Sequence, residues 1–135
     1  PSKVRPVDER TTAAVIERFY EIGVYPDWWK LEPMTSEEAW ENACEAITRN
    51  DPYCRGIVLL GLDAPAEELE RSFEVAAGFD LVRGFAVGRT IFAEAARRWL
   101  KGEMSDEEAI ATMAANYRNL CEVWDRARAR KGRAA

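Results

Sequence analysis

The chain has 135 residues, of which 47% are hydrophobic, and its formal net charge is -5 at pH 7. This length suits one domain or one piece of a larger one, and the apolar content is enough for a core. A mildly acidic surface gives no electrostatic basis for binding nucleic acid, and no apolar run is long enough to span a bilayer. We therefore expect no nucleic-acid partner and no membrane partner.

Absent residue types and motifs exclude several kinds of chemistry. The chain contains no histidine, which rules out Ser-His-Asp and Cys-His nucleophile systems and histidine metal sites. The three cysteines, Cys44, Cys54 and Cys121, are odd in number and lack C-x-x-C spacing. This usage indicates reduced thiols in the cytoplasm, without disulfides or a zinc site. No Walker motif or G-x-G-x-x-G is present, so we expect no nucleotide cofactor and no metal.

Helical patterns alternate with short apolar segments along the chain. In chain order we predict helix 8–22, strand 28–33, helix 35–49, strand 56–61, a helix opened by Asp63 and Pro65, strand 81–88, helix 89–102 and a final helix capped at 105–108. The strands are centred near residues 30, 57 and 84, a spacing that fits a strand followed by a crossover helix. The pattern predicts an α/β fold with three parallel strands.

Apolar residues at helical spacing predict the buried helix faces. They are Trp40, Ala43, Cys44 and Ile47 in one helix, and Leu69, Phe73 and Ala76 in the next. The basic tail follows the final helix, and we interpret it as a solvated or frayed end rather than a binding arm. Its members are Arg126, Arg128, Arg130, Lys131 and Arg133.

Lys30 is the first candidate for chemistry. Strand alternation places Trp28, Lys30 and Glu32 on one face. Burial within an apolar strand lowers the pKa of a lysine, which frees the amine to attack a carbonyl while Glu32 shuttles protons. The alternative interpretation is a structural ion pair between Lys30 and Glu32 at the end of the sheet, and the pattern leaves both open.

A phosphate site is predicted where two strands end. Gly88-Arg89-Thr90 follows the third strand and opens a helix, so backbone N–H groups, the helix dipole, a guanidinium and a hydroxyl converge there. Gly61 and Leu62 follow the second strand and offer amides to the same anion. In parallel α/β folds ligands lie beyond the carboxyl ends of the strands. The alternative is an ordinary helix start in which the glycine only turns the chain.

Three segments also carry a resemblance to a known family: residues 26–33 (PDWWKLEP), residues 51–56 with 58–65, and residues 84–92 (GFAVGRTIF). They resemble the aldolase-like domain fused behind the sugar kinase in bacterial 5-dehydro-2-deoxygluconokinases. That domain is in turn similar to class I aldolases of the tagatose-1,6-bisphosphate type, which are TIM (β/α)8 barrels. The resemblance implies that residues 1–135 form a single partial domain, the C-terminal part of such a barrel.

The resemblance also implies an activity. Lys30 falls at the Schiff-base lysine, Gly61 in a first phosphate loop, and Gly88 with Arg89 in a second. The implied enzyme is a carbon–carbon lyase of inositol catabolism, which splits 5-dehydro-2-deoxygluconate 6-phosphate into dihydroxyacetone phosphate and malonate semialdehyde without a metal. The alternative is a non-catalytic phospho-sugar-binding or assembly domain attached to the sugar kinase.

The predicted sheet is too small to close a barrel, which needs eight strands. Aldolase residues on earlier strands of such a barrel, including a carboxylate partner, are absent from this chain. Three strands leave an exposed edge on each side, a liability that assembly relieves. We therefore expect a homo-oligomer.

Overall fold

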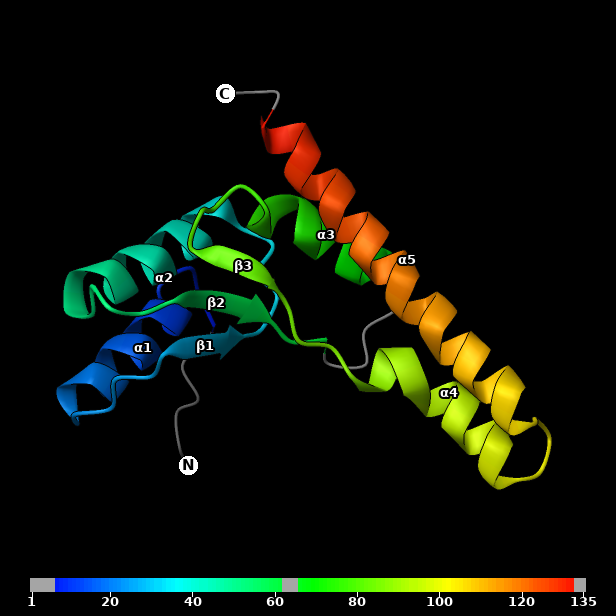
Figure 1. The fold of residues 1–135 in the computed structure, drawn as a ribbon. Coiled ribbons are helices and arrows are strands. Elements are labelled where there is room, and N and C mark those ends of the chain that lie inside the picture. Colours follow the sequence, from blue (N-terminus) through cyan, green and yellow to red (C-terminus); the bar gives the residue numbers. More distant parts are fainter. Residues whose placement is uncertain (1–6, 62–65, 133–135) are drawn as a thin grey trace.

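Three short parallel strands lie at the centre of the fold (Figure 1). The structure, a computed structural model, describes residues 7–61 and 66–132. Its elements are α1 (Thr11–Glu21), β1 (Trp28–Leu31), α2 (Glu37–Asn50), β2 (Gly56–Leu59), α3 (Ala66–Ala76), β3 (Val82–Phe85), α4 (Arg89–Leu100) and α5 (Asp106–Gly132). The strands pair in the order β1-β2-β3, so the predicted α/β fold with three parallel strands is confirmed.

Each strand is shorter than its apolar segment suggested. Each has four residues, because the chain leaves the sheet after Leu31, Leu59 and Phe85 and forms loops there. The first helix also starts later than predicted, at Thr11, because Asp8 lies in a turn whose carboxylate accepts hydrogen bonds from the Thr11 hydroxyl and the Arg10 N–H.

Side-chain caps set the helix starts that the sequence indicated. The Ser36 hydroxyl accepts a hydrogen bond from the N–H of Ala39 at the start of α2. Before α5, Ser105 and Glu108 form a reciprocal capping box, with each side chain accepting from the other residue's N–H. The predicted cap by Asp63 and the turn at Pro65 lie outside the described residues.

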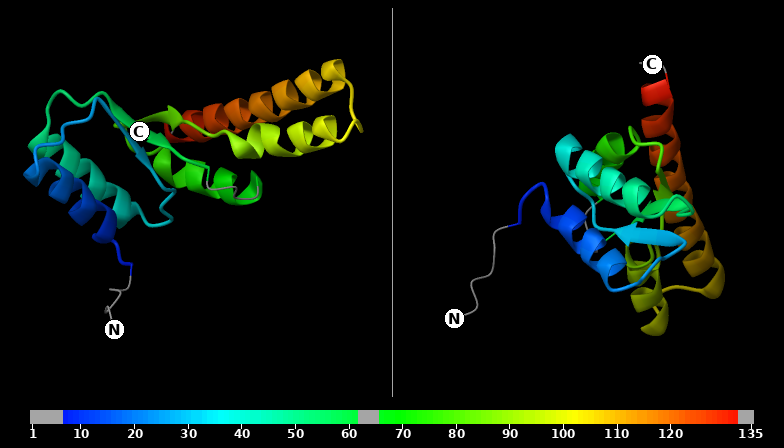
Figure 2. Two further views of the ribbon diagram at one scale, coloured as in Figure 1. Left: turned by 90° about the horizontal axis from the view of Figure 1, so that it is seen from below. Right: turned by 90° about the vertical axis from the view of Figure 1, so that its left-hand side faces the viewer.

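One face of the sheet is covered by α1, α2 and α3, which lie on the same side of it (Figure 2). Trp29 and Leu31 of β1 and Ile57 and Leu59 of β2 are buried on this side. They meet the apolar faces of α2 and α3. The predicted members Trp40, Ala43, Ile47, Leu69, Phe73 and Ala76 are all fully buried, and Cys44 is half-buried.

The opposite side of the sheet is uncovered within the described ranges. We call it the open face, and it carries Trp28, Lys30, Gly56, Val58, Arg83 and Gly84. Trp28 is 45% exposed there, although its neighbour Trp29 is buried and donates a hydrogen bond from its indole N–H to the Tyr20 hydroxyl at 3.0 Å. The alternation of β1 therefore separates a buried helix side from a solvated side.

Helices α4 and α5 form a hairpin that extends away from the sheet, and the far half of α5 returns to pack on α3 (Figures 1 and 2). The ring of Trp124 meets Phe73 edge-on at 5.5 Å, and the ring of Tyr117 lies 6.2 Å from Phe85. This contact places α5 on the same side of the sheet as α3.

The basic tail forms the end of α5, and its arginines contact α3 and the residue that follows it. Arg126 pairs with Glu70 at 3.8 Å and Arg130 with Glu74 at 2.6 Å, while Arg128 donates to the carbonyl of Ala77. Arg126 and Arg130 stay more than half exposed, as a solvated end requires, but α5 is helical through residue 132, so the prediction of fraying is wrong there. The reason is the matching spacing of arginines on α5 and glutamates on α3. Arg133 and the side chain of Lys131 lie outside the description.

Gly56 holds a backbone conformation that other residues rarely adopt, with φ at +142°. A Cβ there would lie 2.7 Å from the carbonyl oxygen of Leu81, a backbone atom that cannot move away easily. We expect Gly56→Ala to lower the free energy of unfolding by about 1–3 kcal/mol, because strain of this kind costs that much. Urea denaturation measures the change.

Gly84→Ala is the matched control. A Cβ at Gly84 meets nothing within 4 Å, and its backbone is not in the left-handed region, so we expect a change below about 0.5 kcal/mol. Equal stabilities for the two variants would contradict the account of Gly56.

Candidate functional site

A hollow of about 320 Å³ lies beyond the carboxyl ends of the strands. Lys30, Gly61, Gly88, Arg89 and Thr90 all line it. The structure thus brings together five residues that the sequence singled out from three separate segments. Their chemical roles stay predictions. Leu62, the other residue predicted to bind phosphate, lies outside the described residues.

A close approach of two loops forms the hollow. The N–H of Ala86 donates to the carbonyl of Leu59 at 2.7 Å, so the chain after β3 stays beside the chain after β2. A Cβ at Gly61 would lie 2.7 Å from a methyl carbon of Val87. Glycine at this position therefore lets the two loops approach each other closely.

The N-terminus of α4 opens onto this hollow. Gly88 is its N-cap and supplies no side-chain hydrogen bond, and its carbonyl accepts the N–H groups of Ile91 and Phe92 at 2.8 and 3.2 Å. A helix start without a side-chain cap presents backbone donors and the positive end of the helix dipole, an arrangement that favours anions.

Thr90 adds an unusual polar atom. Its hydroxyl oxygen is buried and has no hydrogen-bond partner within the described part of the chain. Most buried hydroxyls are paired, and an unpaired one costs stability. Such an atom at the wall of a hollow can form a hydrogen bond with a ligand.

The surroundings of Lys30 differ from those predicted from the sequence. It lies on the open face and its side chain is exposed, so the expected burial in an apolar strand is wrong. The cause is that no described element covers this face. Activation of the amine by burial therefore has no basis in the described residues, although the side chain does reach the hollow.

Glu32 does not join Lys30. The strand ends at Leu31, so the two-residue alternation does not extend to Glu32, and this side chain lines a separate hollow with Thr12 and Ser36. No ion pair joins Lys30 and Glu32 in the described structure. The predicted ion pair is therefore wrong, and so is the shared face.

An apolar wall of the hollow was not predicted from the sequence. Phe92 is 44% exposed and lines it, with a ring carbon 3.2 Å from where a Cβ of Gly88 would lie. Its position four residues after Gly88, on the same side of the helix, was the available signal. Val87 completes this wall.

A second hollow of about 400 Å³ lies at the amino ends of β1 and β2, lined by Tyr25, Asp27, Asp51 and Tyr53 among others. Asp51 accepts a hydrogen bond from the Tyr53 N–H, and Asp27 pairs with Arg55 at 3.6 Å. These groups already have partners within the fold. Because ligands of parallel α/β sheets lie at the carboxyl ends, we take the first hollow as the candidate site.

Cys44 and Cys54 are poor nucleophiles. All three cysteines are free thiols, and burial raises the pKa of Cys44 to about 11. Burial also raises the pKa of Cys54. A thiol with a raised pKa stays protonated near neutral pH and reacts slowly, so thiolate chemistry at these two positions is disfavoured.

Comparison with known families identifies the family to which the chain belongs. A family model described as an uncharacterized protein conserved in bacteria, DUF2090, matches residues 1–128. The chain belongs to this family. No curated protein and no solved structure matches the chain. The description of the DUF2090 family names neither a kinase nor an aldolase, so those parts of the resemblance stay predictions. In the ranges described here, no helix is long and apolar enough to cross a membrane.

The unpaired Thr90 hydroxyl gives a direct test of the site. Thr90→Val keeps the shape of the side chain and removes the unsatisfied oxygen, so we expect the free energy of unfolding without ligand to rise by about 1 kcal/mol. Inorganic phosphate should then stabilise the variant less than it stabilises the wild type. Thermal unfolding with and without phosphate measures both effects.

Thr48→Val serves as the control, because the Thr48 hydroxyl donates to the carbonyl of Cys44 at 2.8 Å on the exposed side of α2. This change should not raise stability and should leave the phosphate effect intact. A destabilised Thr90→Val variant with an unchanged phosphate effect would show that the hydroxyl serves the fold alone.

Proposed function

We propose that the hollow at the carboxyl ends of the strands binds the phosphate group of a phosphorylated sugar acid. One observation carries this proposal: the uncapped start of α4, Gly61 and the unpaired Thr90 hydroxyl share one hollow with Lys30. The first three supply donors for an anion, and Lys30 supplies an amine beside it.

The arrangement of the last helices supports a barrel origin for this site. In many (β/α)8 barrels the phosphate lies after the last two strands, at the start of an extra helix. Here α4 follows β3 and α5 packs on α3, an arrangement that supports such an origin. We therefore propose that the chain is the C-terminal part of a TIM barrel, as a single partial domain.

The proposed reaction is a class I aldol cleavage at Lys30. The neutral amine adds to the substrate ketone, and loss of water gives an iminium ion. Water takes the proton of the hydroxyl group on the carbon that will leave, the carbon–carbon bond breaks, its electron pair enters the iminium, and the aldehyde product is released. Protonation of the resulting enamine carbon and hydrolysis then release the ketone product and the free amine. Glu32 lines another hollow, so the described geometry does not assign it the proton transfers.

The proposed substrate follows from the family resemblance. It is 5-dehydro-2-deoxygluconate 6-phosphate, cleaved to dihydroxyacetone phosphate and malonate semialdehyde in inositol catabolism, with a sugar-kinase domain as partner. Neither a metal nor a cofactor enters this chemistry, because the iminium accepts the electron pair.

A non-catalytic assembly role is the second candidate, and the uncovered sheet favours it. Each of β1 and β3 has only one strand neighbour among the described residues, and α1 carries an exposed apolar stripe of Val15, Phe19 and Ile22. Unpaired strand edges and apolar stripes are features that association covers. In this role the chain forms a homo-oligomer, or binds the kinase, without turnover.

Reductive trapping tests the lyase. Incubation with dihydroxyacetone phosphate and borohydride should add one reduced adduct to the intact mass of the wild type, because only an imine is reduced onto the protein. Lys30→Ala should lose this adduct, whereas Lys101→Ala, which removes an exposed lysine at the end of α4, should keep it. An adduct that persists in Lys30→Ala would refute the assignment of the imine to this residue.

Sedimentation velocity tests the assembly role. Val15 is 51% exposed on α1, so Val15→Glu should shift an oligomer toward monomer at micromolar concentration. Ile110→Glu, at a 68% exposed position on α5, should not. A monomeric wild type, or dissociation caused by Ile110→Glu alone, would contradict an interface on α1.

A further inference from the structure

Neither glycine of the candidate site has the positive φ that favours this residue type. Gly88 has φ at -122°, and Gly61 is not among the described glycines with positive φ. What each position lacks is room for a Cβ. At Gly61 that atom would lie 2.7 Å from a methyl carbon of Val87, and at Gly88 it would lie 3.2 Å from a ring carbon of Phe92. Two apolar side chains therefore occupy the space that the glycines leave.

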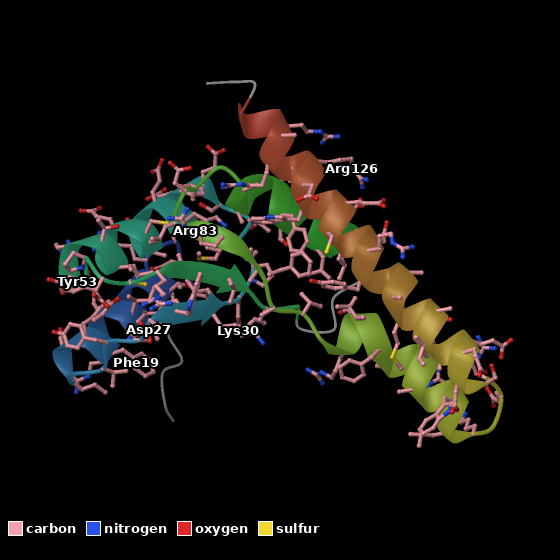
Figure 3. The ribbon with its side chains drawn as sticks, in the orientation of Figure 1. Phe19, Asp27, Lys30, Tyr53, Arg83 and Arg126 are labelled. Atoms are coloured by element: carbon pink, nitrogen blue, oxygen red, sulfur yellow. The ribbon has the colours of Figure 1, made fainter. Side chains whose placement is uncertain are left out.

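Phe92 lies next to the start of α4. Its ring approaches Gly88, the N-cap, whose carbonyl accepts the N–H of Phe92 itself. The side chain is 44% exposed and lines the same hollow as Thr90 and Lys30. Figure 3 shows the Lys30 side chain at the carboxyl end of β1. An aromatic ring therefore lies beside the groups proposed to bind phosphate, and part of its surface is open to a ligand.

The hollow offers more than a phosphate group needs. Its volume of about 320 Å³ reaches the range of small-molecule sites, roughly 300–1,000 Å³, whereas a phosphate group is a single phosphorus atom with its oxygens. Lys30, Thr90 and the start of α4 supply the polar contacts. Phe92 and Val87 supply none, and contact with carbon removes their apolar surface from water. The lining thus fits an anion joined to a carbon chain better than it fits a free anion.

We propose that Phe92 is a specificity-determining residue that packs against the carbon chain next to the bound phosphate, so that the site takes phosphate monoesters in preference to inorganic phosphate. This inference rests on the proposed phosphate site and names the chemical class that the site selects. Val87, on the loop after β3, extends the same apolar wall. Each methylene group that is fully buried on this wall should tighten binding about fourfold.

Methyl phosphate and butyl phosphate test the proposal. They carry the same headgroup and differ only in the length of the carbon chain, and neither has a carbonyl with which Lys30 could form an imine. NMR titration measures both affinities, and the amide signals of Gly61 and Gly88 report where the ligand binds. The wild type should bind butyl phosphate about tenfold more tightly, because the added methylene groups are buried in part. Phe92→Ala should lower this preference to about threefold or less and leave the affinity for methyl phosphate unchanged, which also shows that the variant is folded.

Phe19→Ala is the matched control. Phe19 is 41% exposed on α1, and Figure 3 shows it well apart from Lys30. This variant should keep the full preference for butyl phosphate. Phe92→Leu, which retains an apolar side chain at the hollow, should keep most of it.

Equal binding of both ligands by the wild type, or a full preference that survives Phe92→Ala, overturns the role of Phe92 while the phosphate site stands. The same holds if a folded Phe92→Ala variant loses methyl phosphate as well, since the ring then shapes the site without selecting the ligand. Failure of both ligands to shift the Gly61 and Gly88 signals of the wild type overturns the phosphate site too.

Discussion

One-sided burial of the three-stranded sheet is the constraint on which the rest of this structure depends. Trp29, Ile57 and Val82 must face α1, α2 and α3, because these side chains supply the core of the sheet. Successive side chains of a strand point to opposite faces, so this requirement sends Lys30 and Trp28 to the open face without further choice. The positions of the candidate functional groups are thus a consequence of the packing of their neighbours.

The same constraint explains the irregularity of β3. A regular ladder from Val82 would pair Arg83 with Val58 and turn Phe85 to the open face, away from Phe73. Val58 instead pairs with Gly84, so β3 carries a bulge. The bulge adds one residue, which lets Phe85 stack on Phe73 and turns Gly84, in place of Phe85, to the open face. Aromatic burial is favourable and a bulge locally disrupts the ladder. Core packing at Phe85 therefore stabilises the bulge in β3.

Much of the fold was predictable because it depends on local signals. The capping box at Ser105 and Glu108, the buried stripe of α3 and the parallel order of the strands all follow from residue types at fixed spacing. The clustering of Gly61 and Gly88 followed from the rule that parallel strands end at a common edge. The phosphate-binding role of Gly61 and Gly88 stays a prediction, because an anion site and an ordinary helix start share the same local sequence.

The wrong predictions involve contacts between distant segments or the exact end of a strand. Alternation shows that Lys30 and Trp29 face opposite ways, but it does not show whether anything covers the face of Lys30. Glu32 was placed on the wrong face because the predicted strand was too long. The observed strand ends at Leu31, so the alternation of side chains does not extend to Glu32. The docked end of α5 depends on glutamates of α3, more than fifty residues away in sequence. Composition of the tail alone could not reveal them.

The exposure of Lys30 links the two proposed functions. Imine formation requires a neutral amine, and water around an ammonium group favours the charged form. Association that covers the open face would remove this water and favour the neutral amine. In that case assembly would complete the chemical environment that the three strands leave open around Lys30.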